Sequence, residues 1–487
     1  MRILHAASEA YPLAKTGGLA DVLGALPPAL AELGLDTRLL LPAYAGAREQ
    51  LIRPHRVAEL TIRGLACALI EGGLPGTAQT VWLLDCPTLF DRPGDPYHDA
   101  DGHPHADNGW RFGCFAEAAA QLALDGVQGW RPDLVHAHDW QAALIPAWLA
   151  EQPQRPATLL TIHNLAYQGW FDHDLFTELG LPSAWWDADV GESWGGFSFL
   201  KAGLHFADAL TTVSPNYARE IQTAEFGHGL DERLRLYSSK LLGLLNGIAD
   251  GVWNPATDAY LPSRYDASTV SVGKAANKAA LQAELGLKID PDCLLVGCIS
   301  RFAEQKGMDA VLAAAPMLLT RPLQLVVLGA GDKGLEAGFA ALARAHPDRI
   351  ALGVGYNEPL AHRIEAGADV FLMPSRFEPC GLNQLYSLRY GTLPLVRNVG
   401  GLADSVVNAT PQTLADSSAT GVWFGNTDGG GVCYAVDRAL ALFRTPHWTG
   451  MQHAGMAQDF SWRHAAREYA ALYARVLLAS RKSSVTP

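Results

Sequence analysis

Short apolar runs alternate with longer, helix-like stretches along most of this 487-residue chain. Such alternation is typical of a parallel sheet whose strands are joined by crossover helices. The chain is also longer than one hydrophobic core usually supports, so we expect an α/β protein with two Rossmann-like, doubly wound domains. The expected strands are RILHAAS (2–8), TRLLLP (37–42), TVWLLDC (80–86), DLVHAHD (133–139), TLLTIHN (158–164), ALTTVS (209–214), LLVGCIS (294–300), LQLVVLGAG (323–331), RIALGVG (349–355), DVFLMPS (369–375) and LPLVRNV (393–399).

Residues 246–268 are rich in Gly, Pro, Asn and Asp and have no apolar periodicity, so we interpret them as the connection between the domains. This places the domains at 1–248 and 249–460. Ligands of doubly wound domains bind outside the carboxyl ends of the strands, and we expect the two domains to face each other across a deep cleft. The polar residues at these strand ends are His5, Ser8, Lys15, His138, Asp139, His163, Asn164, Arg301, Glu304, Lys306, Glu378 and Cys380.

The charge of the chain excludes some classes of partner. There are 37 Lys and Arg against 50 Asp and Glu, so no positive field is available for nucleic acid or an anionic membrane. The seven cysteines are scattered and never form CxxC, which indicates neither a disulfide framework nor a zinc ribbon. The N-terminus lacks the apolar core of a signal peptide, and no apolar run is long enough to span a bilayer. We expect a cytoplasmic protein without nucleic-acid or membrane partners.

The pentapeptide GGLAD occurs twice, at residues 17–21 and 400–404. In both places a glycine pair interrupts the chain and an apolar run then starts a helix, whose first N–H groups are open to an anion. The first copy has Lys15 beside it and is expected to bind a ligand. For the second copy we favour a structural joint between loop and helix.

Several blocks in order along the chain carry a family resemblance. They are KTGGLADV (15–22), HAHDWQ (136–141), TIHNLAYQG (161–169), KAGLHFADALTTVSPNYAREI (201–221), SRFAEQKG (300–307) and PSRFEPCGLNQLYSLRYGTLPLVRNVGGLADSV (374–406). Together they resemble the bacterial glycogen synthases and the related starch synthases. The resemblance runs from residue 2 to about residue 406 and continues weakly to the C-terminal helix.

The resemblance implies a retaining glycosyltransferase of the GT-B type. Such an enzyme transfers an α-D-glucosyl unit from ADP-glucose to the non-reducing 4-hydroxyl of an α-1,4-glucan such as glycogen and releases ADP. It also implies that a final helix, at residues 461–480, crosses back to the N-terminal domain. ADP-glucose and glucan are then substrates, and neither a cofactor nor a metal is expected.

Cations are expected around the donor diphosphate. Breaking a sugar–diphosphate bond develops negative charge on the leaving phosphate, which fixed cations stabilise. Arg301 and Lys306 are expected to converge there, as their family counterparts do; the alternative is a structural ion pair of Lys306 with Glu304. The counterpart of Glu378 contacts sugar hydroxyls, with helix capping as its alternative role. Neighbouring donor-side residues are Cys380, Gly381, Leu382 and Asn383, of which Cys380 is expected to pack and Asn383 stands where Thr is frequent.

The sugar side is expected to involve His163, whose counterpart is thought to hydrogen-bond the donor glucose; a satisfied core histidine is the alternative. Asp139 is expected to bind a donor-sugar or acceptor hydroxyl. Ala249 takes the position where the family usually has an acidic residue. The resemblance further implies Lys15, Gly17, Gly18, Asp21, Asn164 and Asn246 on the donor side, and Tyr97 and Trp140 beside the sugar or acceptor.

Retention of configuration by two displacements needs a carboxylate nucleophile under the anomeric carbon. Asp139 and Glu378 are the only candidates, and the sequence places neither of them there. We therefore favour attack of the acceptor on the front face, with the leaving phosphate taking the proton.

Two clusters have the residue types of a metal site without its spacing. They are the segment 98–107, with three histidines and three aspartates, and the pair His136 and His138. We expect no metal at either.

The residues alone leave three other functions possible. They are a glucosyltransferase that uses UDP-glucose, a dehydrogenase, and a non-catalytic glucan-binding protein. The dehydrogenase lacks GxGxxG after the first strand. The binding protein gives no reason to keep Arg301, Lys306 and Glu378 together.

Overall fold

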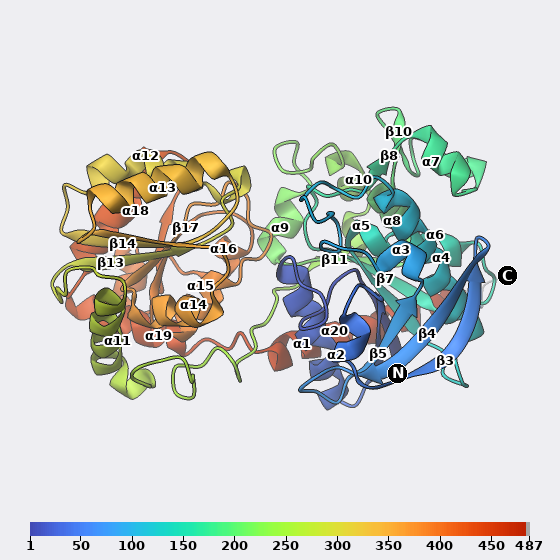
Figure 1. Ribbon diagram of the computed structural model, residues 1–487, viewed down its shortest axis with the longest axis horizontal. Coiled ribbons are helices and arrows are strands. Elements are labelled where there is room, and N and C mark those ends of the chain that lie inside the picture. Colours follow the sequence, from blue (N-terminus) through green and yellow to red (C-terminus); the bar gives the residue numbers. More distant parts are fainter. Residues whose placement is uncertain (484–487) are drawn as a thin grey trace. The chain divides into compact units, whose positions relative to one another are not determined.

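The computed structural model describes residues 1–483 and divides the chain into two compact units. Unit 1 contains Met1–Val213, Ala218–Gly247 and the described residues from Trp462 onward, and unit 2 contains Ser214–Tyr217 and Ile248–Ser461. Each unit has its own large sheet, and Figure 1 labels the main elements of both. No described helix is long and apolar enough to cross a membrane.

The sheet of unit 1 has nine strands, and the first seven in spatial order run parallel to one another. The last two each pair antiparallel with the strand before them. In order across the sheet they are β12 (Leu241–Gly243), β11 (Ala209–Thr212), β7 (Ala157–Ile162), β6 (Leu134–His138), β1 (Arg2–Ala6), β2 (Asp36–Pro42), β5 (Thr80–Asp85), β4 (Leu65–Gly73) and β3 (Ile52–Ile62). A small antiparallel sheet combines β8 (Trp170–Phe171), β10 (Gly196–Ser198) and β9 (Glu192–Ser193).

Helices connect these strands and cover the sheet of unit 1. They are α1 (Gly18–Glu32), α2 (Ala47–Gln50), α3 (Pro87–Phe90), α4 (Asn108–Asp125), α5 (Asp139–Ala142), α6 (Leu144–Ala150), α7 (His173–Glu178), α8 (Phe199–Phe206), α10 (Asp231–Leu236) and α20 (Trp462–Ser483), with short 3-10 turns η1 (Ser183–Trp185) and η2 (Ser238–Lys240). The short helix α9 (Pro215–Glu220) is divided, with its residues up to Tyr217 in unit 2 and those from Ala218 in unit 1. The last helix, α20, packs against α1 and buries Tyr469 and Tyr473 in the core of unit 1. The C-terminal helix therefore belongs to unit 1, although unit 2 separates it in sequence from the rest.

The sheet of unit 2 has six parallel strands. In order they are β15 (Ile350–Val354), β14 (Leu323–Gly329), β13 (Leu294–Ile299), β16 (Val370–Met373), β17 (Leu393–Arg397) and β18 (Val422–Phe424). The helices are η3 (Ala267–Thr269), α11 (Val270–Glu284), η4 (Glu304–Lys306), α12 (Met308–Leu318), α13 (Lys333–Ala345), α14 (Glu358–Gly367), α15 (Asn383–Arg389), α16 (Gly400–Ser405), α17 (Pro411–Ala415), α18 (Gly429–Leu442) and α19 (Pro446–Met456).

All eleven strands expected from the sequence are present, within two residues at each end for the six in unit 1 and the five in unit 2. The prediction of two Rossmann-like α/β domains is confirmed. The sequence did not reveal β3, β4, β8, β9, β10, β12 and β18, of which β3 and β4 are the longest. β3 is an edge strand that carries Pro54 and is exposed over much of its length, so it has neither the apolar run nor the clean alternation of an inner strand.

The structure corrects the interpretation of residues 246–268 as a simple connection. The chain changes units between Gly247 and Ile248, and the residues that follow pack onto unit 2. The indole of Trp253 is stacked between His362 and Tyr386, with ring centroids 3.8 and 3.9 Å away. Three aromatic rings in face-to-face contact anchor this segment despite its loop-like composition.

Candidate active site

The carboxyl ends of three neighbouring strands of unit 1 carry the histidines singled out in the sequence. His5 lies on β1 and pairs in register with His136 of β6, and His138 of β6 pairs with Thr161 of β7. His163 follows β7 directly, two residues beyond Thr161. Because side chains alternate along a strand, all of these side chains lie on one face of the sheet. The register thus gathers three strand ends into one polar layer.

Asp139 holds the backbone that follows β7. Its Oδ1 accepts hydrogen bonds from the N–H of His163 at 2.7 Å and of Asn164 at 3.4 Å. Asp139 itself has a φ of 56°, in the left-handed region that costs a non-glycine residue free energy. Burial raises the pKa of its carboxyl group to about 7, against the two N–H groups, which lower it. Asp139 therefore fixes the position of the His163 backbone.

Glu9 is a site residue that sequence reasoning missed. It is 3 % exposed and accepts hydrogen bonds from the N–H of Thr16 at 2.5 Å, the Thr16 hydroxyl at 2.7 Å and the N–H of Gly17 at 3.2 Å. The hydroxyl of Tyr97 also donates to Glu9, at 2.5 Å, and lies 2.7 Å from the hydroxyl of Ser8. One buried carboxylate thus fastens the first GGLAD loop and Tyr97 together. The only feature in the sequence that could have identified Glu9 is its position, as an acidic residue directly after the apolar strand expected at residues 2–8.

The first GGLAD copy forms an open helix start. Helix α1 begins at Gly18, and Gly17 caps it without a side-chain hydrogen bond. Lys15 donates to Asp21 at 2.7 Å, with about a third of each side chain exposed. A Cβ added at Gly17 would meet no atom within 4 Å, so the protein itself does not require glycine there.

The second GGLAD copy is tightly packed. A Cβ at Gly400 would lie 1.9 Å from the carbonyl oxygen of Glu378, and one at Gly401 2.2 Å from that of Cys380. The N–H of Gly401 donates to the Glu378 carbonyl at 3.1 Å. These glycines let two backbone segments of unit 2 meet, so the second copy supports the loop that carries Glu378.

Lys306 pairs with Glu378 in unit 2. The ammonium of Lys306, at the end of η4, lies 2.6 Å from the Glu378 carboxylate, which also accepts from the Ser375 hydroxyl at 2.9 Å. The alternative ion pair of Lys306 with Glu304 is therefore wrong. Arg301 is exposed in the loop that follows β13. Unit 2 thus holds a lysine ammonium against the carboxylate of a buried glutamate.

The residues after Glu378 shape this part of unit 2. Gly381 has a φ of +70°, and a Cβ there would lie 2.4 Å from Gln384. Cys380 is buried, as expected of a packing residue. Leu382 precedes α15, and Asn383 donates to the carbonyl of Ile299 at 2.8 Å. Asn383 thereby ties the start of α15 to the end of β13.

Asn246 and Trp140 complete the predicted residues of unit 1. Asn246 is 7 % exposed, and its Oδ1 has no hydrogen-bond partner within residues 1–483. Such an orphaned buried acceptor is rare without a ligand or water. The Trp140 ring packs among Phe112, Phe171 and Phe199, with centroids 5.2 to 6.2 Å apart. The structure gives Trp140 a packing role.

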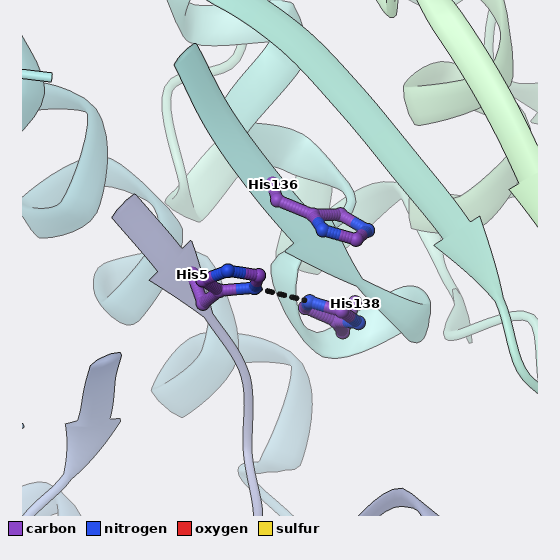
Figure 2. A group of neighbouring side chains, drawn as sticks. All are labelled: His5, His136 and His138. Carbon is purple, nitrogen blue, oxygen red and sulfur yellow. Dashed lines mark hydrogen bonds between the residues drawn. The ribbon is translucent and has the colours of Figure 1, made fainter. Parts of the chain in front are cut away.

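Two groups of residues have the composition of a metal site. Asp99, Asp101 and His103 lie in a surface turn that the Asp99 carboxylate closes by accepting two backbone N–H groups. His5, His136 and His138 are fully buried and lie close together, as Figure 2 shows. The two ring nitrogens of His136 lie at hydrogen-bond distance from Tyr473 and Thr161, so that ring is already engaged.

Comparisons with known proteins agree over the whole length of the chain. The profile of the starch synthase catalytic domain matches residues 2–236, and that of glycosyl transferases group 1 matches residues 286–425. Glycogen synthase 1 of Methylococcus capsulatus is 51 % identical over 98 % of this chain and 97 % of its own. The glycogen synthase of Thioalkalivibrio sulfidiphilus is 49 % identical over 97 % and 99 %.

Solved structures give the same result. The catalytic domain of starch synthase IV from Arabidopsis thaliana, bound to ADP and acarbose, is 33 % identical with a TM-score of 0.87, over 98 % of this chain and 99 % of its own. A sucrose-phosphate synthase from Thermosynechococcus elongatus, at 18 % identity and a TM-score of 0.61 over 98 % and 99 %, shares the fold. With these full-length matches the chain belongs to the glycogen synthase family and is a hexosyltransferase with two Rossmann-like domains.

Proposed function

We propose that this enzyme transfers an α-D-glucosyl unit from ADP-glucose to the non-reducing 4-hydroxyl of an α-1,4-glucan, with retention of configuration and release of ADP. Full-length identity of about half to glycogen synthases supports the reaction, and ADP in the related starch synthase structure supports the nucleotide. The observation that carries the proposal is the Lys306–Glu378 pair, a cation and a buried carboxylate 2.6 Å apart.

The two members of this pair suit the two charges that develop in the reaction. As the bond between the anomeric carbon and the phosphate oxygen breaks, negative charge grows on the diphosphate and positive charge on the sugar ring. Lys306 and the exposed Arg301 stabilise the diphosphate, and Glu378 stabilises the ring and its hydroxyls. Held in place by Ser375, the carboxylate does not need to reorganise during the reaction.

Given retention of configuration, the engagement of the two carboxylates supports a route without a covalent intermediate. Glu378 is bound by Lys306 and Ser375, and Asp139 by two backbone N–H groups, which makes both poor nucleophiles. The acceptor oxygen therefore attacks the anomeric carbon from the face that the diphosphate leaves. Its proton passes to the departing phosphate oxygen, and the new carbon–oxygen bond keeps the configuration.

In unit 1, the ring of His163 hydrogen-bonds the donor glucose, and Asp139 holds the backbone of His163 and Asn164 in place. The open start of α1, with Lys15, Gly17, Gly18 and Asp21, takes part in donor binding. The Oδ1 of Asn246, which has no hydrogen-bond partner among the described residues, supplies a further acceptor. Tyr97, fixed by Glu9, lies on the sugar side.

We propose that the reaction takes place in the cytoplasm and needs no metal. All seven cysteines are free and buried, which fits a reducing compartment. The cations of unit 2 supply the charge that a divalent ion would otherwise provide at a diphosphate.

The test measures incorporation of glucose from ADP-glucose and, separately, from UDP-glucose into glycogen by the purified protein. We expect efficient transfer from ADP-glucose, stoichiometric ADP and a product that is degraded by an enzyme specific for α-1,4 bonds. Faster transfer from UDP-glucose, or glycogen binding without transfer, would overturn the proposal. Glu378→Gln serves as the inactive control.

A further inference from the structure

Three histidines of unit 1 form a continuous chain of ring nitrogens. The Nε2 of His163 lies 3.0 Å from the Nδ1 of His138, and the Nε2 of His138 lies 3.3 Å from the Nδ1 of His5. Figure 2 shows the rings of His5 and His138 turned toward each other from neighbouring strands. His5 and His138 are fully buried, and His163 is 9 % exposed. The chain thus leads from the core to the Nδ1 of His163.

His136 lies beside this chain without being a link in it. Its ring centroid is 3.9 Å from that of His138, but its own nitrogens lie 2.8 Å from the Tyr473 hydroxyl and 2.6 Å from the Thr161 hydroxyl. It therefore has the burial and the strand of His138 without the contact to His163.

Each ring in the chain is neutral at physiological pH. Burial lowers the pKa of His5 and His163 to about 3 and that of His138 well below its usual value. A neutral imidazole carries one N–H and one bare nitrogen, so its two nitrogens cannot both donate. The chain consequently has only two self-consistent arrangements of protons.

In the first arrangement His5 donates from Nδ1 to His138, and His138 donates from Nδ1 to Nε2 of His163. The proton of His163 is then on its Nδ1. In the second arrangement every bond is reversed, and the Nδ1 of His163 is bare. The two arrangements differ at the buried end, where the Nε2 of His5 is bare in the first and protonated in the second.

The environment of His5 distinguishes between them. Its Nε2 is buried and has no hydrogen-bond partner within the described residues. A buried N–H without an acceptor is rarer in proteins than an acceptor without a donor, and it loses the full hydration of the donor. The first arrangement is therefore the more stable one.

We infer that His5 and His138 are positioning residues that hold the imidazole of His163 with its proton on Nδ1, so that it donates a hydrogen bond to an oxygen of the bound glucose. This inference rests on the proposed sugar contact of His163. Neither His5 nor His138 touches the substrate; they act by fixing a tautomer, as the orienting carboxylate of a catalytic triad does.

The direct test is nitrogen NMR of the ligand-free protein with ¹⁵N-labelled histidine, assigned with His163→Gln. We expect the Nδ1 of His163 to carry the proton and its Nε2 to resonate as a bare nitrogen. A proton on Nε2 in the wild-type protein would overturn the inference. This readout does not depend on which sugar nucleotide the enzyme uses, so a failure of the proposed function is recognised separately by the transfer assay.

Variants test whether the linked histidines His5 and His138 determine the tautomer of His163. His138→Phe removes the donor to the Nε2 of His163 and is expected to give a mixture of His163 tautomers and to lower kcat by at least ~10-fold with little change in the KM for the donor. His5→Phe leaves the Nε2 of His138 against an apolar ring, where a bare nitrogen is again favoured, so its effect on the tautomer and on kcat is expected to be smaller. His136→Phe is the matched control, with the same substitution on the same strand, and is expected to keep both the tautomer and kcat. An unchanged His163 spectrum in His138→Phe would contradict the inference.

A conservative variant guards against misfolding. In His138→Asn the amide can present its nitrogen as a donor or its oxygen as an acceptor to the Nε2 of His163, and the nitrogen spectrum shows which of the two it does. Where the amide nitrogen donates, His163 is expected to keep its proton on Nδ1 and kcat to exceed that of His138→Phe. Equal loss of activity in the two variants, with an Nδ1 proton in His138→Asn, would show that the tautomer does not matter for catalysis.

Discussion

The ammonium of Lys306 lies 2.6 Å from the carboxylate of Glu378, 72 residues further along the chain. The Lys306 side chain is 20 % exposed and that of Glu378 only 6 %. Removal of the lysine therefore leaves a buried carboxylate without its counter-ion, and catalytic and structural effects of a Lys306 variant must be separated.

Lys306→Ala is expected to lower kcat at saturating ADP-glucose by at least ~100-fold, about 2.7 kcal/mol of transition-state stabilisation. The melting temperature is also expected to fall, because Glu378 becomes an unpaired buried charge. The double variant Lys306→Ala, Glu378→Gln should regain stability without regaining activity. Lys333→Ala, which removes an exposed lysine paired with Glu336, is the control and should change neither quantity. Full activity of Lys306→Ala would place the diphosphate elsewhere.

Glu9→Gln tests the carboxylate that fastens the first GGLAD loop. A neutral amide accepts more weakly than a carboxylate, so the hydrogen bonds from Thr16, Gly17 and Tyr97 weaken. We expect a loss of roughly 1–3 kcal/mol in the free energy of unfolding and a raised KM for ADP-glucose. The exposed Glu59, changed in the same way, serves as control. Unfolding by urea and initial-rate kinetics measure the two effects, and unchanged values for both would contradict this role.

The two glycine pairs are expected to respond differently to alanine. Gly401→Ala places a Cβ 2.2 Å from a backbone oxygen, so it should lower the melting temperature and the activity together. Gly17→Ala meets no atom and has a φ of −155°, which alanine adopts readily, so the melting temperature should be unchanged. A KM for ADP-glucose that rises about 10-fold in Gly17→Ala alone would report close approach of the donor. The reverse order of stabilities would show that the first copy is the structural one.

Asp139 gives a pH dependence of stability. Because its folded pKa is raised from 3.8 to about 7, the folded protein binds more protons than the unfolded chain between these values. Its contribution to stability is therefore present at low pH and is lost as the pH rises from about 4 to 7, by at most ~1.4 kcal/mol per pH unit. Asp139→Asn keeps an acceptor for the two N–H groups but does not titrate. The difference in unfolding free energy between variant and wild type should shift in favour of the variant across this range; a constant difference would exclude the raised pKa.

Chelation tests the absence of a metal. Arg301 and Lys306 supply positive charge, and both ring nitrogens of His136 are engaged by hydrogen bonds, so transfer from ADP-glucose should survive excess EDTA. The assay compares initial rates before and after dialysis against the chelator. Complete loss of activity that Mg²⁺ or Zn²⁺ restores would contradict this expectation.

Much of the fold follows from local sequence. The eleven predicted strands are apolar runs between helical stretches, and a parallel sheet covered on both faces needs that pattern. The strand β3 was not predicted, because an exposed edge strand does not need such an apolar run. Trp253 shows the opposite case, since a loop-like composition conceals an aromatic stack that depends on His362 and Tyr386.

The sequence alone determined the fold class, the family and the strand ends at which polar side chains gather, because these depend on patterns within a few residues and on blocks that recur in relatives. Only the tertiary structure decided which side chains contact one another in the candidate site. Glu378 rather than Glu304 pairs with Lys306, Glu9 binds Tyr97, and His5 meets His138 across two strands. Each of these contacts joins residues more than 70 positions apart, and strand register and loop packing bring them within hydrogen-bond distance. Spacing along the chain carries no information about such pairs, because it fixes a face of a strand but not the neighbour on the next one.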